Sequence, residues 1–386
     1  MDIPACTVNQ PPEQKVAHAQ TCARFSPGVK TGDRSLLGPI YSASTFLSFD
    51  LSSADTAIFY GAGSWSHGHL DIVRDASITT AVVDLWARYD DRDLLDAAAI
   101  CTTKDGNRKG IFIQTPEGGC HGVCPRLRWD VKYRVPAKLS GLEGLAVNAS
   151  VFSVSAEALF PIKDLSVTTS NAEIELFKID SANVNLKTTN GQIVAGGVIS
   201  EQAVLTSSNG KVSGTLAGPV IAVKTTNNQI SGNFVVHKKL SLRTTNGKVD
   251  VGVSLVNAEG STDPGLFDVG VSSTNDKVQV VYEDQPFEST LTSQIGSTNG
   301  NVLVKHHYNY EGVFALTTTN GPATVVALSS RHPDHPELRR EFSVGGGDKK
   351  GGTKVGEVHW SGEGREVVKG TSGAKSTNAH VDVEFA

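Results

Sequence analysis

A short triplet of Thr or Ser, Thr or Ser, and Asn recurs along the second half of the chain and constrains the fold more than any other feature. Successive Asn residues of the triplets are separated by 19, 19, 18, 19, 29, 24 and 21 positions. A period near 20 residues is typical of stacked arrays, in which each unit buries its apolar edge only against its neighbours. The Asn residues predicted to form one structural ladder are Asn171, Asn190, Asn209, Asn227, Asn246, Asn275, Asn299 and Asn320.

The residues that flank each triplet alternate in polarity. The residue four positions before the Asn is usually apolar, and the residue three positions after it is nearly always Ile or Val, as Leu242 and Val249 are around Asn246. Because successive side chains of a strand point to opposite faces, the first hydroxyl residue is predicted to face the interior and the second to face solvent. Each repeat therefore predicts a strand, a corner at Asn and a second strand.

A set of Asn-Gly hairpins in an antiparallel sandwich is the competing interpretation, because Asn-Gly is the strongest short hairpin signal. However, Ala172, Asn228 and Asp276 stand in place of the glycine in other copies, and Ala resists the positive φ that such turns demand. Identical Thr and Asn side chains about 4.8 Å apart can also hydrogen-bond along a stack, which explains why the hydroxyls recur. The sequence therefore favours an all-β, single-stranded β-solenoid or β-helix with coils of about 19 residues.

Four regions are predicted along the chain. They are an extended arm (1–43), an N-terminal β region leading into the solenoid (44–164), the repeat solenoid (165–328), and a Gly-rich excursion with C-terminal capping strands (329–386). One helix is expected within 91–100, capped by Asp90 or Asp91. A ninth triplet ends at Asn378, and its strands are predicted to add a last coil that closes the open end of the stack.

The cysteines predict structural disulfides. A zinc site would need a second closely spaced Cys or His pair, so no metal is predicted. Together with Asn148-Ala-Ser150, a possible glycosylation acceptor, the cysteines indicate an extracellular or cell-surface protein from which a signal or anchor segment has been removed. The disulfide candidates are Cys6, Cys22, Cys101, Cys120 and Cys124.

Charge and hydropathy exclude several classes of partner. The formal net charge of -5, without clustered Lys and Arg, predicts no nucleic-acid partner. The sequence has no run of about 18 apolar residues, so no transmembrane segment is predicted. No phosphate-binding glycine loop or nucleophile motif is present, and no cofactor is expected.

The Thr-Thr-Asn-Gly-Lys/Gln-Val/Ile units, together with the strand from Trp129 to Pro136 that leads into them, resemble the putative-adhesin β-solenoid repeat family of bacterial and fungal surface proteins, a domain of unknown function. The resemblance covers roughly residues 58–328, and it implies a repeat fold and surface association. The family has no shared catalytic residues to carry over. The cysteine-bearing arm and loop, and the tail after residue 330, depart from the family pattern.

Several clusters invite a chemical interpretation. His67, His69 and Asp71 form one set and His332, Asp334 and His335 another, and both are predicted to lie in solvated loops rather than to bind metal. The aromatic run of His306, His307, Tyr308 and Tyr310 is expected to decorate the surface. Glu173 and Glu175 stand two apart on a strand and share a face, which places them in range for glycoside chemistry, although outward polar residues are ordinary at such positions.

The leading hypothesis is an adhesin-like binding or scaffold module at the cell surface or in the extracellular space. It would recognise a glycan polymer or a surface protein along the solenoid face, and no catalytic residue is identified. One alternative is a polysaccharide-active glycoside hydrolase or lyase with a groove on the solenoid. Another is a structural protein that self-assembles through uncapped ends. The ligand and the oligomeric state stay open.

Overall fold

The alternation of apolar and polar residues in the sequence becomes an alternation of buried and exposed side chains in the computed structural model, as along β6 (Ala81–Tyr89). The structure describes residues 19–25, 29–35, 38–64, 67–117, 126–138, 142–158, 161–260, 264–327, 331–346, 351–362 and 370–386. The chain divides into unit 1 (Met1–Gly191) and unit 2 (Gln192–Ala386). Both units are built from stacked, mostly parallel strands, which confirms the predicted all-β solenoid class.

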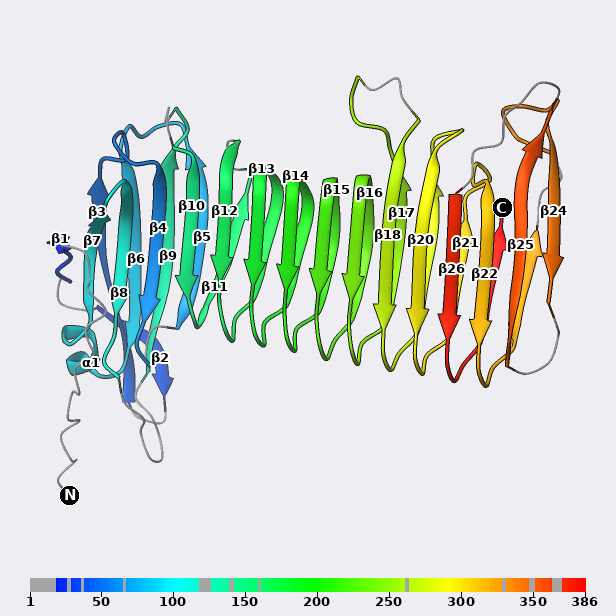
Figure 1. Cartoon of the computed structure of the whole chain (residues 1–386). Coiled ribbons are helices and arrows are strands. Elements are labelled where there is room, and N and C mark those ends of the chain that lie inside the picture. Colours follow the sequence, from blue (N-terminus) through cyan, green and yellow to red (C-terminus); the bar gives the residue numbers. More distant parts are fainter. Residues whose placement is uncertain are drawn as a thin grey trace. The chain divides into compact units, whose positions relative to one another are not determined.

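The strands of unit 1 and one short helix are labelled in Figure 1. They are β1 (Ala19–Cys22), β2 (Val29–Ser35), β3 (Gly38–Phe49), β4 (Thr56–Ala62), β5 (Gly68–Asp75), β6 (Ala81–Tyr89), α1 (Arg92–Asp96), β7 (Ala99–Asp105), β8 (Arg108–Gln114), β9 (Leu127–Pro136), β10 (Gly144–Ala149), β11 (Phe152–Glu157), β12 (Ile162–Thr168) and β13 (Ile174–Lys187).

Two sheet faces enclose the interior of unit 1. The first face has the strand order β2, β3, β6, β9, β5, β11 and the first part of β13. The second has the order β1, β7, β8, β4, β10, β12 and the second part of β13. The backbone of β13 turns between these parts at Lys178, where φ is 54°. Phe59 of the second face packs edge-on against Phe152 of the first, with ring centroids 5.4 Å apart, so the two faces share one core.

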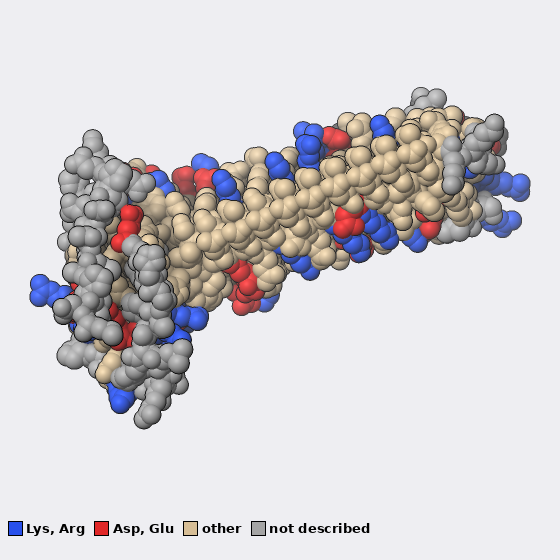
Figure 2. Space-filling model, turned by 90° about the horizontal axis from the view of Figure 1, so that it is seen from below, with Lys and Arg blue, Asp and Glu red and all other residues tan. Residues whose placement is uncertain are grey.

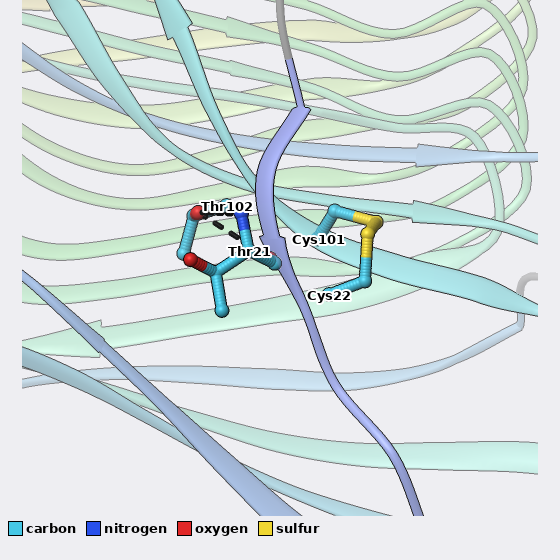
Figure 3. Close-up of a disulfide and its surroundings, with 4 residues drawn as sticks. All are labelled: Thr21, Cys22, Cys101 and Thr102. Carbon is cyan, nitrogen blue, oxygen red and sulfur yellow. Dashed lines mark hydrogen bonds between the residues drawn. A yellow bond between two sulfur atoms is a disulfide. The ribbon is translucent and has the colours of Figure 1, made fainter.

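A disulfide ties the first strand of unit 1 to its sheet. Cys22 of β1 is bonded to Cys101 of β7, 79 residues away (Figure 3). The Thr21 amide donates to Thr102 Oγ1 at 3.1 Å, and the Ala23 amide donates to the carbonyl of Ile100 at 2.7 Å. The segment from Ala19 to Ala23 is therefore part of the sheet edge. Cys6, Cys120 and Cys124 lie outside the described residues, and their pairing stays a prediction.

Unit 2 continues with strands only, among its described residues. They are β14 (Ile193–Thr206), β15 (Val212–Lys224), β16 (Ile230–Arg243), β17 (Val249–Leu255), β18 (Leu266–Ser273), β19 (Val278–Asp284), β20 (Thr290–Ser297), β21 (Val302–His306), β22 (Gly312–Thr318), β23 (Ala323–Ala327), β24 (Arg339–Gly345), β25 (Gly352–Ser361), β26 (Gly370–Ser376) and β27 (Val381–Phe385).

The long strands β14, β15 and β16 pair in parallel along both sheet faces of unit 2. From β16 the stack divides into separate strands. One face continues as β17, β19, β21, β27 and β23. The other continues as β18, β20, β26 and β22, and then ends with the antiparallel strands β25 and β24. Strands on both sides of each corner pair in parallel with the neighbouring coils, so the Asn corners are not hairpin tips.

The first hydroxyl residue of each triplet is buried, as the parity of the repeats predicts. Thr244 is 2% exposed, its Oγ1 donates to the carbonyl of Asn228 at 3.1 Å, and it accepts from the Gly247 amide at 3.2 Å. The hydroxyl therefore closes its own corner and binds the corner of the preceding coil. Gly247 approaches that coil closely, because a Cβ atom added there would lie 1.8 Å from the Asn228 carbonyl oxygen.

The last coil is not at the end of the stack. β26 pairs with β20 on one side and β22 on the other, and β27 pairs with β21 and β23. The prediction that the segment ending in Phe385 closes the open end is therefore wrong. The strand that covers the edge of β22 is β25, which runs antiparallel to it.

The predicted helix at 91–100 is shorter than expected. It spans Arg92–Asp96, and its N-cap is Asp91, whose side chain accepts from the Asp93 amide at 2.9 Å. Ala99 and Ile100 instead begin β7, where Ile100 is buried. Pairing with β8 therefore overrides the weak helical pattern at these residues.

Candidate functional site

The outer surface of the first face of unit 1 brings together residues from two distant sequence motifs. His69 and Asp71 lie on β5, whereas Glu175 lies on β13, and β11 runs between these two strands. In the parallel register, Asp71 stands opposite Ser155, and Ser155 stands opposite Glu175. Residues that stand opposite each other on neighbouring strands point to the same face of the sheet, so these side chains form one surface cluster.

Hydrogen bonds link the side chains of this cluster. His69 Nδ1 lies 2.9 Å from Ser153 Oγ, and His69 Nε2 lies 3.3 Å from Ser155 Oγ. The Ser155 hydroxyl donates to Asp71 Oδ1 at 3.0 Å. The imidazole ring of His69 therefore lies between two hydroxyl groups. The hydroxyl of Ser155 links this ring to the carboxylate of Asp71.

A pair of carboxyl groups borders the cluster. Burial raises the pKa of Glu175, and the charge of Glu173 and a hydrogen bond between the two carboxyl groups raise it further. The nearby His69 acts in the opposite direction and lowers it. Crowded negative charge therefore characterises this end of the surface.

An ion-paired carboxylate lies on the other side of His69. Asp130 of β9 stands opposite His69, and its carboxylate is 3.2 Å from Arg88 Nη2 and 3.8 Å from Arg128 Nε. Both arginine side chains are more than half exposed, so the pairs are screened by water and position the carboxylate more than they stabilise the fold.

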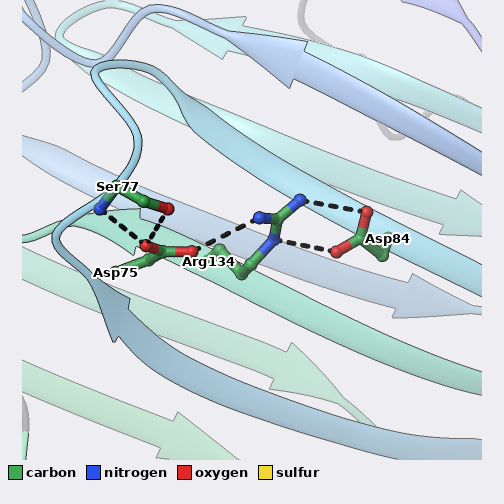
Figure 4. A network of polar contacts seen from close by, with 4 residues as sticks. All are labelled: Asp75, Ser77, Asp84 and Arg134. Atoms are coloured by element: carbon green, nitrogen blue, oxygen red, sulfur yellow. Dashed lines mark hydrogen bonds and ion pairs between the residues drawn. The ribbon is translucent and has the colours of Figure 1, made fainter.

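A further network fixes the geometry of strands β5, β6 and β9. Arg134 donates from Nε to Asp84 at 2.8 Å and from Nη1 to Asp75 at 3.3 Å (Figure 4). Hydrogen bonds from the side chain and backbone of Ser77 hold the pKa of Asp75 below its ordinary value, and Arg134 adds to this effect. Arg134 thus joins β9 to β5 and β6, and β5 and β9 carry members of the cluster.

The geometry suits binding better than the hydrolytic chemistry considered from the sequence. In a serine hydrolase triad, one ring nitrogen contacts the nucleophile and the other contacts a carboxylate. Here both ring nitrogens of His69 contact hydroxyl groups. Glycosidases separate their two carboxyl groups by about 5 Å or more. Glu173 and Glu175 belong to one chain segment and interact with each other, as the raised pKa of Glu175 shows, rather than facing each other across a cleft.

In unit 2 the structure buries two members of the aromatic run that was expected to decorate the surface, His306 and Tyr310. His306 is 1% exposed, stacks between Tyr282 and Phe385, and shares a hydrogen bond of 2.8 Å with the hydroxyl of Ser372. Tyr310 is also buried. The expected surface decoration is therefore wrong for these two residues, because β26 and β27 cover them from the inserted coil.

The motif at 332–335 contacts the same region. His332 is buried, its Nε2 lies 2.7 Å from Asn309 Oδ1, and its Nδ1 accepts from the amides of Asp334 and His335. Both ring nitrogens are thus engaged by protein groups, and the residue caps a turn rather than lying in a solvated loop. Within the described ranges, no three His, Cys, Asp or Glu side chains are grouped to hold a metal ion.

The Asn side chains form hydrogen-bonded ladders along the corners. In unit 1, Asn190 Nδ2 donates to Asn171 Oδ1 at 2.5 Å. In unit 2 the donor-to-acceptor distances are 2.6 to 2.7 Å, and Figure 2 shows the corners as a strip without charged side chains, bordered by Lys, Arg, Asp and Glu. The ladder of unit 2 runs through Asn209, Asn227, Asn246, Asn275, Asn299, Asn378 and Asn320.

Sequence reasoning missed three members of the unit 1 cluster. Ser153, Ser155 and Asp130 carry no motif of their own, and their only signal is an outward position in an alternating strand. Their role depends on which strands become neighbours. The coil of β4 and β5 lies between that of β8 and β9 and that of β10 and β11, although it precedes both in sequence.

Fold and cluster together define a β-solenoid protein with an open, polar, hydrogen-bonded face. No family model matches the chain, and no curated protein matches it.

Solved structures with similar strand arrangements include a putative adhesin from Parabacteroides merdae (10% identity, TM-score 0.30, covering 89% of this chain and 96% of that one). Others are a putative adhesin from Bacteroides fragilis (10%, 0.27, 88% and 96%) and a putative cell adhesion protein from Clostridium sporogenes (9%, 0.19, 89% and 100%). Likenesses at these TM-scores carry no inference about the function of this chain.

Proposed function

We propose that this protein is a non-catalytic, adhesin-like module that binds an extended polymer or a surface protein across its outer sheet faces. The observation that carries the proposal is the cluster around His69, in which hydroxyl, imidazole and carboxyl groups stand in register on an open face. Polar groups that are positioned by a rigid sheet and half exposed suit a ligand that lies flat on the surface.

The proposal places the protein at the cell surface or in the extracellular space. The Cys22–Cys101 disulfide supports this location, because disulfides persist in oxidising compartments and are rare in the cytosol. Asn148 of the Asn-Ala-Ser acceptor sequence is exposed on β10, where a glycan could be attached. Among the described residues, no helix is both long enough and apolar enough to cross a membrane.

The test is a binding screen combined with a search for turnover. The purified chain is applied to an array of glycans and to extracellular matrix proteins, and the same ligands are examined for new reducing ends or unsaturated products. Binding without products is expected. Turnover that disappears in Glu173→Gln or Asp71→Asn would overturn the proposal, and so would the absence of any polymer or protein ligand.

A further inference from the structure

Two large aromatic side chains are exposed on the same face as the cluster. Along β6, Val83, Leu85 and Ala87 point inward and are fully buried, whereas Trp86 points outward and is 44% exposed. Phe46 on the neighbouring β3 is 68% exposed. Phe46 pairs with Asp84 and is therefore a diagonal neighbour of Trp86 on the same face. Single exposed apolar residues are common, but two aromatic residues on one open sheet face are a mark of a binding surface.

The sheet register aligns both rings with the polar cluster. Trp86 stands opposite Asp130, Asp130 opposite His69, and His69 opposite Ser153. A second row, two residues further along each strand, starts at Phe46 on β3. The members of this row are Phe46, Asp84, Lys132, Asp71, Ser155 and Glu175.

The two rows have the size and chemistry of a site for several linked sugars. From β6 to β13 the row crosses four strand spacings, which is about 19 Å. A pyranose with equatorial hydroxyl groups has a flat C–H surface that stacks on an indole ring, while its hydroxyl groups bond to carboxylate, imidazole and serine groups at its edge. The face has aromatic side chains for the C–H surface at one end and polar side chains for the hydroxyl groups beyond them.

The charges of the face select among sugars. Glu173 and Glu175 lie at the end distant from Trp86, where the charge of Glu173 raises the pKa of Glu175, whereas Asp71 lies midway, opposite Lys132. A polymer of acidic sugars would bring further negative charge to this end and would be disfavoured. A glycan without acidic groups meets no such penalty.

We propose that the outer face formed by β3, β6, β9, β5, β11 and β13 is a binding site for a neutral glycan, with Trp86 as its stacking platform. The inference rests on the proposed binding function and adds the site and the ligand class. Asp130 and Asp71 accept hydrogen bonds from the hydroxyl groups of the sugars that follow the one on Trp86, and His69, held by Ser153 and Ser155, keeps the polar row in place.

The test is isothermal titration calorimetry of the full chain with defined oligosaccharides and polysaccharides. These are hexasaccharides of β-1,4-linked glucose and of β-1,4-linked N-acetylglucosamine, a soluble β-1,3-glucan, and polygalacturonate as the acidic counterpart. At least one neutral probe is expected to bind, and polygalacturonate is expected not to bind. Trp86→Ala should weaken binding about tenfold, whereas Trp86→Phe retains a ring and should weaken it less.

Ile199→Ala is the matched control, because Ile199 is 58% exposed on a strand of unit 2 and lies outside the proposed site. Its affinity should equal that of the wild type. Unchanged affinity in Trp86→Ala would overturn the site while leaving the binding function intact, and so would preference for polygalacturonate. Circular dichroism and thermal unfolding of each variant separate lost binding from lost folding.

Discussion

Asn378 donates its side-chain amide to Asn299 Oδ1 at 2.7 Å, although the two residues are 79 positions apart. Asn320 in turn donates to Asn378 Oδ1 at 2.7 Å. The C-terminal coil therefore occupies a slot between two coils that are consecutive in sequence. Because each coil of a solenoid contacts only its neighbours, this slot links the folding of the chain end to that of the two coils beside it.

Removal of the inserted coil should therefore loosen a limited part of unit 2. In a chain that ends at residue 362, β20 and β22 each lose the parallel partner that β26 provides. Hydrogen exchange should accelerate in β20 to β23, while β14 to β16 keep their protection, because unpaired strand edges open locally. Full protection of β22 in the shortened chain would show that the inserted coil is dispensable. Added peptide 370–386 should restore protection, whereas a peptide with Val381 and Val383 changed to Asp should not.

The sequence predicts the structure of each coil but not the order of the coils in the stack. The parity around each triplet identifies a strand, a corner and an inward hydroxyl, because these depend on local alternation. The place of a coil in the stack depends on which Val and Ile edges meet, and all coils present nearly the same edge. The triplet at Asn378 thus predicts a coil but not its position, and the coil of β4 and β5 is displaced from sequence order in the same way.

The candidate site illustrates the same limit. His69 with Asp71, and Glu173 with Glu175, are visible as separate motifs, yet only the insertion of β11 between β5 and β13 joins them. Trp86 could have been found from the sequence. It lies between Leu85 and Ala87, whose side chains point inward, so the alternation of the strand predicts that Trp86 points outward. A large aromatic residue at such a position is the signal that local alternation does provide.

Thr244 and Thr245 offer a matched test of the inward hydroxyls. Thr244→Val keeps the shape of the side chain but leaves the Gly247 amide and the Asn228 carbonyl without their buried partner. The free energy of unfolding should fall by about 1–3 kcal/mol. Thr245 is exposed, so Thr245→Val should change it by less than about 0.5 kcal/mol. Equal effects in urea unfolding would contradict the assigned role of the inner hydroxyl.

The Cys22–Cys101 disulfide should stabilise unit 1 by fixing β1 on the edge of β7. The bond joins residues 79 apart, so Cys22→Ser with Cys101→Ser should lower the free energy of unfolding by about 2–4 kcal/mol. Thermal unfolding with and without a reducing agent measures the effect. The reductant should destabilise the wild type and leave the double variant unchanged, and a wild type that is insensitive to reduction would argue against a structural role.

Glu173→Gln should lower the pKa of Glu175. The variant removes the neighbouring negative charge, which is one of the causes that raise this pKa, while the burial of Glu175 persists. Carboxyl carbon NMR titration of Glu175 measures the change. Glu157→Gln is the control, because Glu157 pairs with Lys178 at 3.2 Å and does not contribute to the raised pKa of Glu175. A pKa that stays in place in Glu173→Gln would show that the two carboxyl groups do not interact.

His306 should make the stability of unit 2 depend on pH. Burial, with a smaller effect of Arg340, lowers the pKa of His306 to about 3, whereas the unfolded chain has a value near 6.5. Between these values the unfolded state binds a proton that the folded state excludes. Stability is therefore complete above about pH 6.5 and is lost as the pH falls toward 3, with a slope of up to about 1.4 kcal/mol per pH unit.

Urea unfolding at pH 7, 6, 5 and 4 measures this slope, and the difference between variants isolates His306 from the acidic groups. His306→Gln cannot take up the proton, so its stability should fall less steeply than that of the wild type, even if the variant is less stable at pH 7. His380→Gln changes an exposed imidazole and should keep the wild-type slope. A His306→Gln curve parallel to the wild type would mean that protonation of the buried imidazole does not cause the loss of stability at low pH.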